Sequence, residues 1–334
     1  MRAVVLEGRR RVRVREVPVP DRDGRTVVRV QRVGLCGTDH KIVEGEIPVQ
    51  FPRVLGHEIL GEVVDPGAAD GPAIGTRVLI DPSSSCGRCA LCRRSLDHLC
   101  RLGRLMGRDR DGGLAEFVAV DALHLHPIPD AVGDDDASVA QVLGTCVHAQ
   151  RLVDVFPGDV AVVVGLGVAG LLHVQLLRAR GVRTVIGVTR SALRREMALS
   201  IGASAVAAPE EAADTVRDAT DGRGGDVVVE AVGQVTTLGQ VIELACPGGT
   251  VLVFGTVTAG TGQLRYYDLY FKELRVLSSR AARPRDYADA IALLAAKAVE
   301  GAPLVSARIS LDDAAAAFAH WREDQRQLKV VVDV

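Results

Sequence analysis

The chain has 334 residues, with 40 lysines and arginines against 42 aspartates and glutamates, so its formal net charge is −2. This near-balance excludes a general nucleic-acid binder and a protein held on an acidic membrane, because both classes need a basic surplus. Hydrophobic residues make up 48% and charged residues 25%, which is the composition of a folded chain. No apolar run approaches the roughly 18 residues of a membrane helix, and the length predicts about two domains.

Up to about residue 150 the sequence reads as short strands separated by glycines and prolines. Many of these strands alternate apolar and polar residues, which indicates a mainly antiparallel sheet or barrel with one buried face. The chain opens on such a strand and not on the apolar core of a secretory signal, so we expect a cytoplasmic protein. The predicted strands are residues 3–6, 11–17, 26–33, 58–65 and 77–80.

Two short motifs in this region carry residues that suit a catalytic metal. Cys36 stands in Gly-Leu-Cys-Gly-Thr-Asp, and His57 stands in Gly-His-Glu directly before the carboxylate of Glu58. A thiolate, an imidazole and a carboxylate are the ligand types of catalytic zinc sites. In isolation, a cysteine and a histidine at this separation would usually be unrelated core residues. The metal motif and the nucleotide motif described next favour the zinc site.

A loop at about residues 84–102 concentrates thiols, since Cys86, Cys89, Cys92 and Cys100 fall within 15 residues. In a reducing compartment such a cluster is more typical of a bound metal than of disulfides. Four thiolates at this spacing predict a structural zinc with no open coordination position, which would hold together a loop that lacks its own core. An iron–sulfur cluster is the alternative.

From about residue 152 the pattern changes to apolar runs alternating with helical stretches. Residues 160–164 form an apolar run that leads into Gly165-Leu-Gly167-Val-Ala-Gly170 and a helix to about residue 180. A GxGxxG motif between a buried strand and a helix predicts a dinucleotide site, with the pyrophosphate at the positive end of the helix. A glycine turn in another kind of α/β sheet is the alternative.

The second strand of this region, residues 184–188, ends in Thr189, Arg190 and Ser191. A carboxylate at this point would bind both ribose hydroxyls and repel a 2′-phosphate, but none is present. An arginine pairs well with a phosphate, so we predict a preference for NADP(H) over NAD(H). The alternative is that Arg190 stacks on the adenine and the site accepts both cofactors.

The alternation continues to the end of the chain and predicts a parallel sheet covered by helices on both faces. The expected helices are residues 191–200, 237–245 and 287–298, with another beginning near residue 311. The expected strands are residues 226–230, 250–254, 274–277 and 328–332. The acidic run at residues 134–136 is expected to be solvated.

Together these motifs resemble the zinc-dependent medium-chain dehydrogenase/reductase family, and they occur in the family's order along essentially the whole chain. The resemblance implies a GroES-like β-rich catalytic domain, formed by residues 1–151 and 280–334, around a Rossmann domain at residues 152–279. It also implies a cleft for substrate, zinc and nicotinamide, and homodimers or homotetramers. The matching segments are residues 36–39, 56–58, 86–100, 165–170, 224–233 and 247–249.

Residue by residue, the resemblance makes Cys36 and His57 the first two protein ligands of a catalytic zinc and places the third at Gln141. Glu58 would bind the metal directly or in exchange with water. Cys146 is a second candidate for the third ligand, or else a buried structural thiol. The family implies cofactor contacts at Gly233 and Gly255, beside those of the glycine loop.

Thr38 matches the hydroxyl that passes the substrate's proton outward. The relay usually ends at a histidine five positions after the cysteine, where this chain has Lys41. His40 lies one residue earlier, and a structural role at the surface is the alternative for it. Polar candidates for the substrate pocket are Glu44, Glu46 and Arg280.

The leading hypothesis is a dehydrogenase with two zinc ions per chain that transfers a hydride between NADP(H), or NAD(H), and a secondary alcohol or ketone. A small polyol, sugar or cyclitol is the expected substrate, with a simple alcohol or threonine as alternatives. Reductases for activated alkenes or quinones usually lack the metal ligands, so Cys36 and His57 count against them. A non-catalytic NADP(H)-binding sensor stays open, because Gln141 and Lys41 depart from the family's pattern. Neither nucleic acid nor membrane is an expected partner.

Overall fold

The computed structural model describes residues 1–67, 71–258, 260–320 and 327–334. The chain divides into two units, which we call the β-rich unit (residues 1–144 and 281–334) and the α/β unit (residues 145–280). The first boundary lies inside one helix, α3 (Ala140–Gln150).

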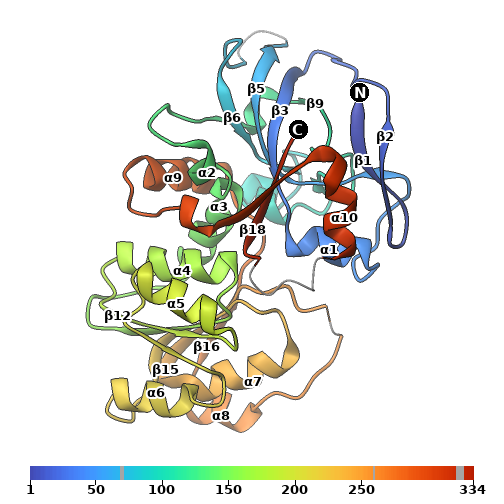
Figure 1. The fold of residues 1–334 in the computed structure, drawn as a ribbon. Helices are drawn as coiled ribbons and strands as arrows, with labels where there is room; N and C mark the ends of the chain where they lie inside the picture. The colour runs from blue at the N-terminus through green and yellow to red at the C-terminus, as the bar shows by residue number, and fades with distance from the viewer. Residues whose placement is uncertain (68–70, 259, 321–326) are drawn as a thin grey trace. The chain divides into compact units, whose positions relative to one another are not determined.

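The β-rich unit is built on a seven-stranded sheet with the order β10-β6-β5-β3-β18-β17, in which β9 also pairs with β3 (Figure 1). A second sheet has the order β2-β1-β4, and two short strands, β7 and β8, pair separately. The bounds are β1 Arg2–Gly8, β2 Arg11–Glu16, β3 Thr26–Gly34, β4 Arg53–Val54, β5 Glu58–Asp65, β6 Arg77–Ile80, β7 Ser83–Ser84, β8 Arg104–Leu105, β9 Phe117–Val120, β10 Leu125–Pro127, β17 Val305–Ser310 and β18 Lys329–Asp333.

Strand β3 lies at the centre of this sheet and joins distant parts of the sequence. It pairs antiparallel with β5 on one side and with β18 on the other, where Val332 lies opposite Val33. Apolar residues of these strands, among them Val28, Ile59 and Val330, form one buried core with Leu311. The β-rich unit is therefore complete only when the C-terminal segment is in place.

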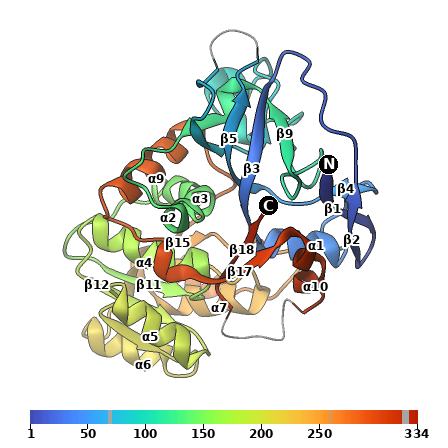
Figure 2. The same ribbon diagram turned by 45° about the horizontal axis from the view of Figure 1, so that its top comes forward.

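Helices α2, α3 and α9 lie side by side in the β-rich unit (Figures 1 and 2). The acidic run at residues 134–136 lies in α2, where Asp134 is exposed as expected and Asp135 and Asp136 are half-buried. Asp134 pairs with Arg77 at 2.6 Å, and Asp136 accepts hydrogen bonds from the backbone of Gly301 and Ala302. The α-helices described in this unit are α1 Gly37–Val43, α2 Asp134–Ala137, the first part of α3 (residues 140–144), α9 Pro284–Ala295 and α10 Ala314–Ala319.

The α/β unit has a six-stranded parallel sheet with the order β13-β12-β11-β14-β15-β16. Helices α4 and α5 cover one face and α6, α7 and α8 the other (Figure 1). The bounds are β11 Val160–Val164, α4 Val168–Ala179, β12 Thr184–Val188, α5 Ala192–Ser200, β13 Ala205–Ala207, α6 Ala212–Ala219, β14 Gly225–Glu230, α7 Val235–Leu244, β15 Ala245–Val253, α8 Tyr266–Phe271 and β16 Arg275–Ser278.

The order of strands in this sheet reverses between β11 and β14, which are neighbours although two strands separate them in the sequence. Ligands of doubly wound sheets bind where the order reverses, beyond the carboxyl ends of the strands. The predicted α/β class, with a β-rich part beside a doubly wound parallel sheet, is confirmed. None of the helices in the described ranges combines the length and apolarity needed to cross a membrane.

Candidate functional site

The β-rich unit brings Cys36, His57 and Glu58 together. One ligand atom from each of the three lies within 4.8 Å of the others. The register of the sheet produces this cluster, because Gly34 at the end of β3 lies opposite Glu58 at the start of β5. Cys36 follows β3 by two residues, and His57 directly precedes β5. Three of the four predicted ligands, Cys36, His57 and Glu58, therefore converge on one point.

Asp39 holds the imidazole of His57. Its Oδ1 lies 3.0 Å from His57 Nδ1, and its Oδ2 accepts a hydrogen bond from the backbone N–H of Cys36 at 3.1 Å. Asp39 is fully buried. Burial opposes a charge on His57, but the negative charges of Asp39 and Cys36 outweigh it and raise the pKa of His57 well above its usual value. A carboxylate on Nδ1 leaves Nε2 as the metal-binding nitrogen, the arrangement seen around protein zinc.

Glu58 is shared between the cluster and a buried lysine. Its Oε2 accepts a hydrogen bond from Lys329 Nζ at 2.6 Å, and Lys329 also donates to the carbonyl of Leu35. The second oxygen, Oε1, is buried and has no hydrogen-bond partner among the described residues. A buried carboxylate oxygen without a partner, next to a thiol and an imidazole, fits a zinc ion. Burial opposes a charge on Lys329, but Glu58 and Cys36 raise its pKa.

Gln141, the expected third ligand, is buried on α3 and is hydrogen-bonded to a residue of α9. Its Nε2 donates to the hydroxyl of Tyr287 on α9, at 3.4 Å, across 146 residues of sequence. Gly144, one turn along α3, makes room for this ring, since a Cβ there would lie 2.4 Å from Tyr287. Because Nε2 is engaged, Oε1 is the atom of Gln141 that suits a metal.

Cys146, the other candidate for the third ligand, has a different contact. Its buried thiol donates to the carbonyl of Ala169 in the first turn of α4, at 3.7 Å. This contact favours the interpretation of Cys146 as a structural thiol.

Thr38 stands in the first turn of α1, whose N-cap is Cys36. The backbone N–H of Thr38 donates to Cys36 Sγ at 3.5 Å, so the hydroxyl-bearing residue is fixed beside the thiol. His40 is buried, with 7% of its surface exposed, which contradicts the expectation of a surface position. The pocket candidate Glu44 is held by Arg10 through its carboxylate.

The four cysteines of the loop also converge. The distances between sulfur atoms are 3.5 Å for Cys89–Cys92 and Cys86–Cys100, and 3.9 Å for Cys86–Cys92 and Cys89–Cys100. A tetrahedron of sulfurs about 2.3 Å from zinc has edges of about 3.8 Å, so the loop fits the ion. Backbone N–H donors, that of Cys92 first, lower the pKa of Cys89 to about 6 and favour its thiolate. All seven cysteines of the chain are free.

The glycine loop of the α/β unit joins β11 to α4, and its first and third glycines are packed closely against neighbouring atoms. Gly165 has a φ of +98°, and a Cβ on Gly170 would lie 1.8 Å from the carbonyl oxygen of Gly165. At Gly167, a Cβ would meet nothing within 4 Å. The backbone is thus packed at the first and third glycines and open at the second, where a pyrophosphate would approach.

The segment after β12 is fixed by a second arginine that sequence reasoning did not single out. Arg195 donates to the carbonyls of Thr189 and Arg190, at 2.8 and 3.2 Å. Ser191 is the N-cap of α5 and accepts from the N–H of Arg194. The side chain of Arg190 is exposed. The loop is therefore held by its backbone and leaves the guanidinium of Arg190 available to a ligand.

Gly233 and Gly255 meet around the fully buried Glu230 at the end of β14. Glu230 Oε1 accepts from the N–H of Gly233 at 2.8 Å and from the hydroxyl of Thr237 at 2.6 Å. A Cβ on Gly255 would lie 2.2 Å from the nitrogen of Gly233. This contact places two predicted cofactor residues side by side.

Asp39, Lys329 and Glu230 are among the residues with supporting roles that sequence reasoning missed. Asp39 lay inside a motif and was given no role. Lys329 and Glu230 left a weak signal, because Lys329 begins the apolar strand β18 and Glu230 ends the apolar strand β14. A charge within a buried strand requires a partner, although the sequence does not say which.

Comparison with known proteins supplies the context for these clusters. Residues 22–130 match the alcohol dehydrogenase GroES-like domain, and residues 168–296 match the zinc-binding dehydrogenase family. The chain is 31% identical to the sorbitol dehydrogenase of Halalkalibacterium halodurans over 306 residues, which is 90% of this chain and 89% of that protein. It is also 31% identical to the L-galactonate-5-dehydrogenase of Escherichia coli K12 over 287 residues, 84% of this chain and 83% of that one.

A solved structure is similar over the full length. It is the crystal structure of a zinc-binding dehydrogenase from Sinorhizobium meliloti 1021 bound to NADP. The two chains are 37% identical, with a TM-score of 0.93 over 100% of this chain and 99% of that one.

Proposed function

Because the chain belongs to the zinc-dependent medium-chain dehydrogenase/reductase family and is an NAD(P)-dependent alcohol dehydrogenase, we propose that it oxidises a secondary alcohol of a polyol, sugar or cyclitol and prefers NADP(H). The observation that carries this proposal is the convergence of Cys36, His57 and Glu58 in the β-rich unit. Relatives named for sorbitol and L-galactonate support the polyhydroxy substrate class.

The residues of the cluster have distinct proposed roles in the reaction. Cys36, His57, Gln141 and Glu58 would hold the zinc, with Glu58 bound directly or in exchange with water. When bound, zinc supplies a Lewis acid that lowers the pKa of the substrate hydroxyl, and the nicotinamide supplies the hydride acceptor. The hydroxyl of Thr38 would accept the proton of the substrate hydroxyl while releasing its own proton to solvent. Asp39 fixes the ring of His57 through the 3.0 Å contact with Nδ1.

The cofactor preference rests on the segment after β12. Thr189 and Ser191 offer hydroxyls, and Arg190 offers a guanidinium whose planar fork matches a 2′-phosphate. The solved relative bound to NADP supports this assignment. The glycines at 165, 167 and 170 would hold the pyrophosphate, and Gly233 and Gly255 would make further contacts with the cofactor.

The proposal includes two zinc ions per chain, one at Cys36 and His57 and one in the four-cysteine loop. Both clusters collect ligand atoms within 4.8 Å. It also includes the cytoplasm as the location, which the free thiols support.

A homodimer or homotetramer is part of the same proposal. Strand β16 is an edge of the α/β sheet, and three of its four residues are exposed. Beside it in sequence, α8 exposes Tyr266, Tyr267, Tyr270 and Phe271, between 68% and 83% each. An exposed apolar surface next to an unpaired edge strand is the kind of surface that subunits cover.

The direct test is a screen of NADP⁺ reduction by the zinc-loaded protein against polyols, sugar acids, cyclitols, aldoses, L-threonine and simple alcohols. We expect the wild type to turn over a polyhydroxy substrate. The Cys36→Ser variant should lose both this activity and about one of its two zinc ions per chain. Retained activity in His57→Ala would contradict the proposed zinc chemistry. One zinc per chain with no turnover of any substrate would favour the sensor.

A further inference from the structure

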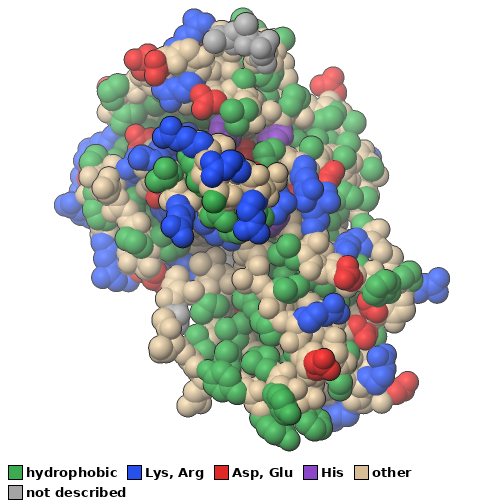
Figure 3. Space-filling model, turned by 180° about the vertical axis from the view of Figure 1, so that it is seen from behind, with side chains coloured by type: hydrophobic (Ala, Val, Ile, Leu, Met, Phe, Trp, Pro, Cys, Tyr) green, Lys and Arg blue, Asp and Glu red, His purple; other side chains and the backbone are tan. Residues whose placement is uncertain are grey.

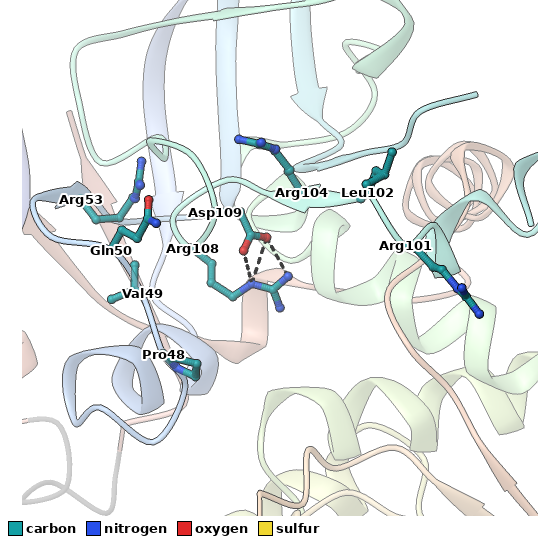
Figure 4. Close-up of a pocket in the computed structure, with 10 residues that line it drawn as sticks. Pro48, Val49, Gln50, Arg53, Arg101, Leu102, Arg104, Arg108 and Asp109 are labelled. Atoms are coloured by element: carbon teal, nitrogen blue, oxygen red, sulfur yellow. Dashed lines mark hydrogen bonds and ion pairs between the residues drawn. The ribbon is translucent and has the colours of Figure 1, made fainter. Parts of the chain in front are cut away.

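A hollow of about 650 Å³ in the β-rich unit has four arginines in its lining. Its volume falls in the range of small-molecule sites, about 300–1,000 Å³. Four of its ten lining residues are arginine and one is aspartate. Figure 4 shows one wall formed by residues 48–53 and the other by residues 101–104, with Arg108 and Asp109 between them.

Some N–H donor groups of the arginines in this hollow have no hydrogen-bond partner among the described residues. Arg108 forms its ion pair with Asp109 through Nε and Nη2, the latter at 2.7 Å, so that Nη1 has no partner among the described residues. The exposed guanidinium of Arg104 makes no ion pair within the part of the chain that the structure describes. Arg53 pairs with Asp111 at 3.1 Å, but its buried Nε has no partner there.

The surrounding segment is strongly basic in a chain with a net charge of −2. Residues 86–110 contain seven arginines and two aspartates, which gives 7 − 2 = +5. In Figure 3, Lys and Arg side chains gather around the middle of the face turned to the viewer. A concave surface of one charge sign attracts and orients ligands of the opposite sign.

The hollow borders the segments that carry the proposed metal ligands. Residues 48–50 follow α1, which holds Thr38, and Arg53 lies four residues before His57. The stretch after Asp109 is bonded to the backbone leading to that histidine, with Gly112 donating to Val54 and Gly113 to Gly56, at 2.8 and 2.9 Å. The arginines therefore lie on segments that adjoin, or are hydrogen-bonded to, those carrying Thr38 and His57.

From these observations we propose that the hollow binds an anionic end group of the substrate, a carboxylate or a phosphate, through Arg104 and Arg108. The inference rests on the proposed dehydrogenase function and narrows its substrate class to sugar acids or sugar phosphates, in preference to neutral polyols. Arginine suits this role because its fork of N–H donors matches both groups in a bidentate way.

The test uses the zinc-loaded full-length protein in two arms. In the first, calorimetry measures binding of gluconate and of inorganic phosphate to the wild type, Arg104→Gln and Arg104→Lys. Loss of a charged hydrogen bond predicts roughly 10- to 100-fold weaker binding in Arg104→Gln. The matched control is Arg94→Gln, an exposed arginine of the same segment outside the hollow, which should bind as the wild type does. Tighter binding of gluconate than of phosphate assigns the carboxylate, and the reverse assigns the phosphate.

In the second arm, kcat/KM is compared for matched acid, phosphate and neutral substrates, such as L-galactonate, galactitol 1-phosphate and galactitol. We expect the ratio of anionic to neutral substrate to fall at least tenfold in Arg104→Gln, mainly through KM. If the ratio of anionic to neutral kcat/KM is the same in Arg104→Gln as in the wild type, or falls equally in Arg94→Gln, the inference is overturned. The proposed dehydrogenase function would not be affected by that result. If anions bind in an arginine-dependent way but no substrate is turned over, the hollow is an anion site and the proposed dehydrogenase function is refuted.

Discussion

Glu58 and Lys329 form a buried ion pair between residues 271 positions apart, with 2.6 Å between Oε2 and Nζ. Their side chains are 1% and 3% exposed. The pair joins the start of β5 to the start of β18, on either side of the central strand β3. It fixes a proposed metal ligand from the far end of the chain.

We expect Lys329→Met to lower the free energy of unfolding by about 3–5 kcal/mol, because it leaves the carboxylate of Glu58 buried without its counter-ion. Urea denaturation of the zinc-loaded protein measures the loss. The double variant Glu58→Gln with Lys329→Met removes both charges and should recover part of the stability. A loss below about 1 kcal/mol in the single variant would mean that the pair is solvated.

We expect Cys100→Ser to reduce the zinc content by about one ion per chain, since four thiolates close the coordination sphere of the loop. Elemental analysis measures this, and limited proteolysis should then cut the loop near residues 84–102. The matched control is Cys246→Ser, a buried cysteine outside both metal clusters of the described residues, which should keep its zinc. An absorption spectrum of an iron–sulfur cluster would contradict the assignment.

We expect Arg190→Asp to lower kcat/KM for NADP⁺ roughly 10- to 100-fold, because a charged hydrogen bond to the 2′-phosphate is replaced by repulsion. The value for NAD⁺ should change much less. Arg183→Asp makes the same charge change at an exposed position just before the opposite end of β12 and serves as the control. Equal losses with both cofactors would favour the alternative in which Arg190 stacks on the adenine.

We expect His173 to make the α/β unit less stable in mild acid. Burial lowers the pKa of this fully enclosed ring to about 3, while the unfolded chain has the usual pKa of about 6.5. Below about pH 6.5 the unfolded state takes up the proton and the folded state does not, so stability falls as the pH falls. At pH 5 the loss is about 2 kcal/mol relative to pH 7.5.

His173→Leu should flatten this dependence, and the change of the unfolding free energy between pH 7.5 and 5 is the measurement. Gln150, which contacts the ring at 3.0 Å, keeps the backbone oxygen of residue 173 as an acceptor at 3.1 Å. An unaltered slope in His173→Leu would refute the role of this ring.

Elements with a strong local signal could be predicted from the sequence. The strands expected at residues 58–65, 77–80, 160–164 and 184–188 coincide with β5, β6, β11 and β12. Helix α1 was not predicted, because its short stretch contains glycine and threonine and is held by a capping box between Cys36 and Asp39. Strand β15 begins five residues before the expected 250–254, since its pairing with β14 continues past an irregularity at a Pro-Gly-Gly turn signal.

For the candidate site, sequence reasoning reached the residues whose side chains carry the chemistry, and missed those that orient them. Cys36 and His57 stand in local motifs, so their types and neighbours are visible in the sequence. Lys329 contacts Glu58, which is 271 residues away in the sequence, and Tyr287 contacts Gln141, which is 146 residues away. No local sequence pattern indicates such pairs. The arginine-lined hollow likewise depends on two segments, residues 48–53 and 101–109, that only the folded chain brings together.

The pairing of β18 with β3 has a consequence for synthesis on the ribosome. Residues 145–280 are continuous, so the α/β unit can fold as soon as it has emerged. The β-rich unit must wait for β18, and until then residues 32–34 of β3 form an unpaired edge that other nascent chains could contact. Glu58 also lacks its lysine during this interval, so the proposed catalytic metal centre reaches its final form only after Lys329 has been synthesised.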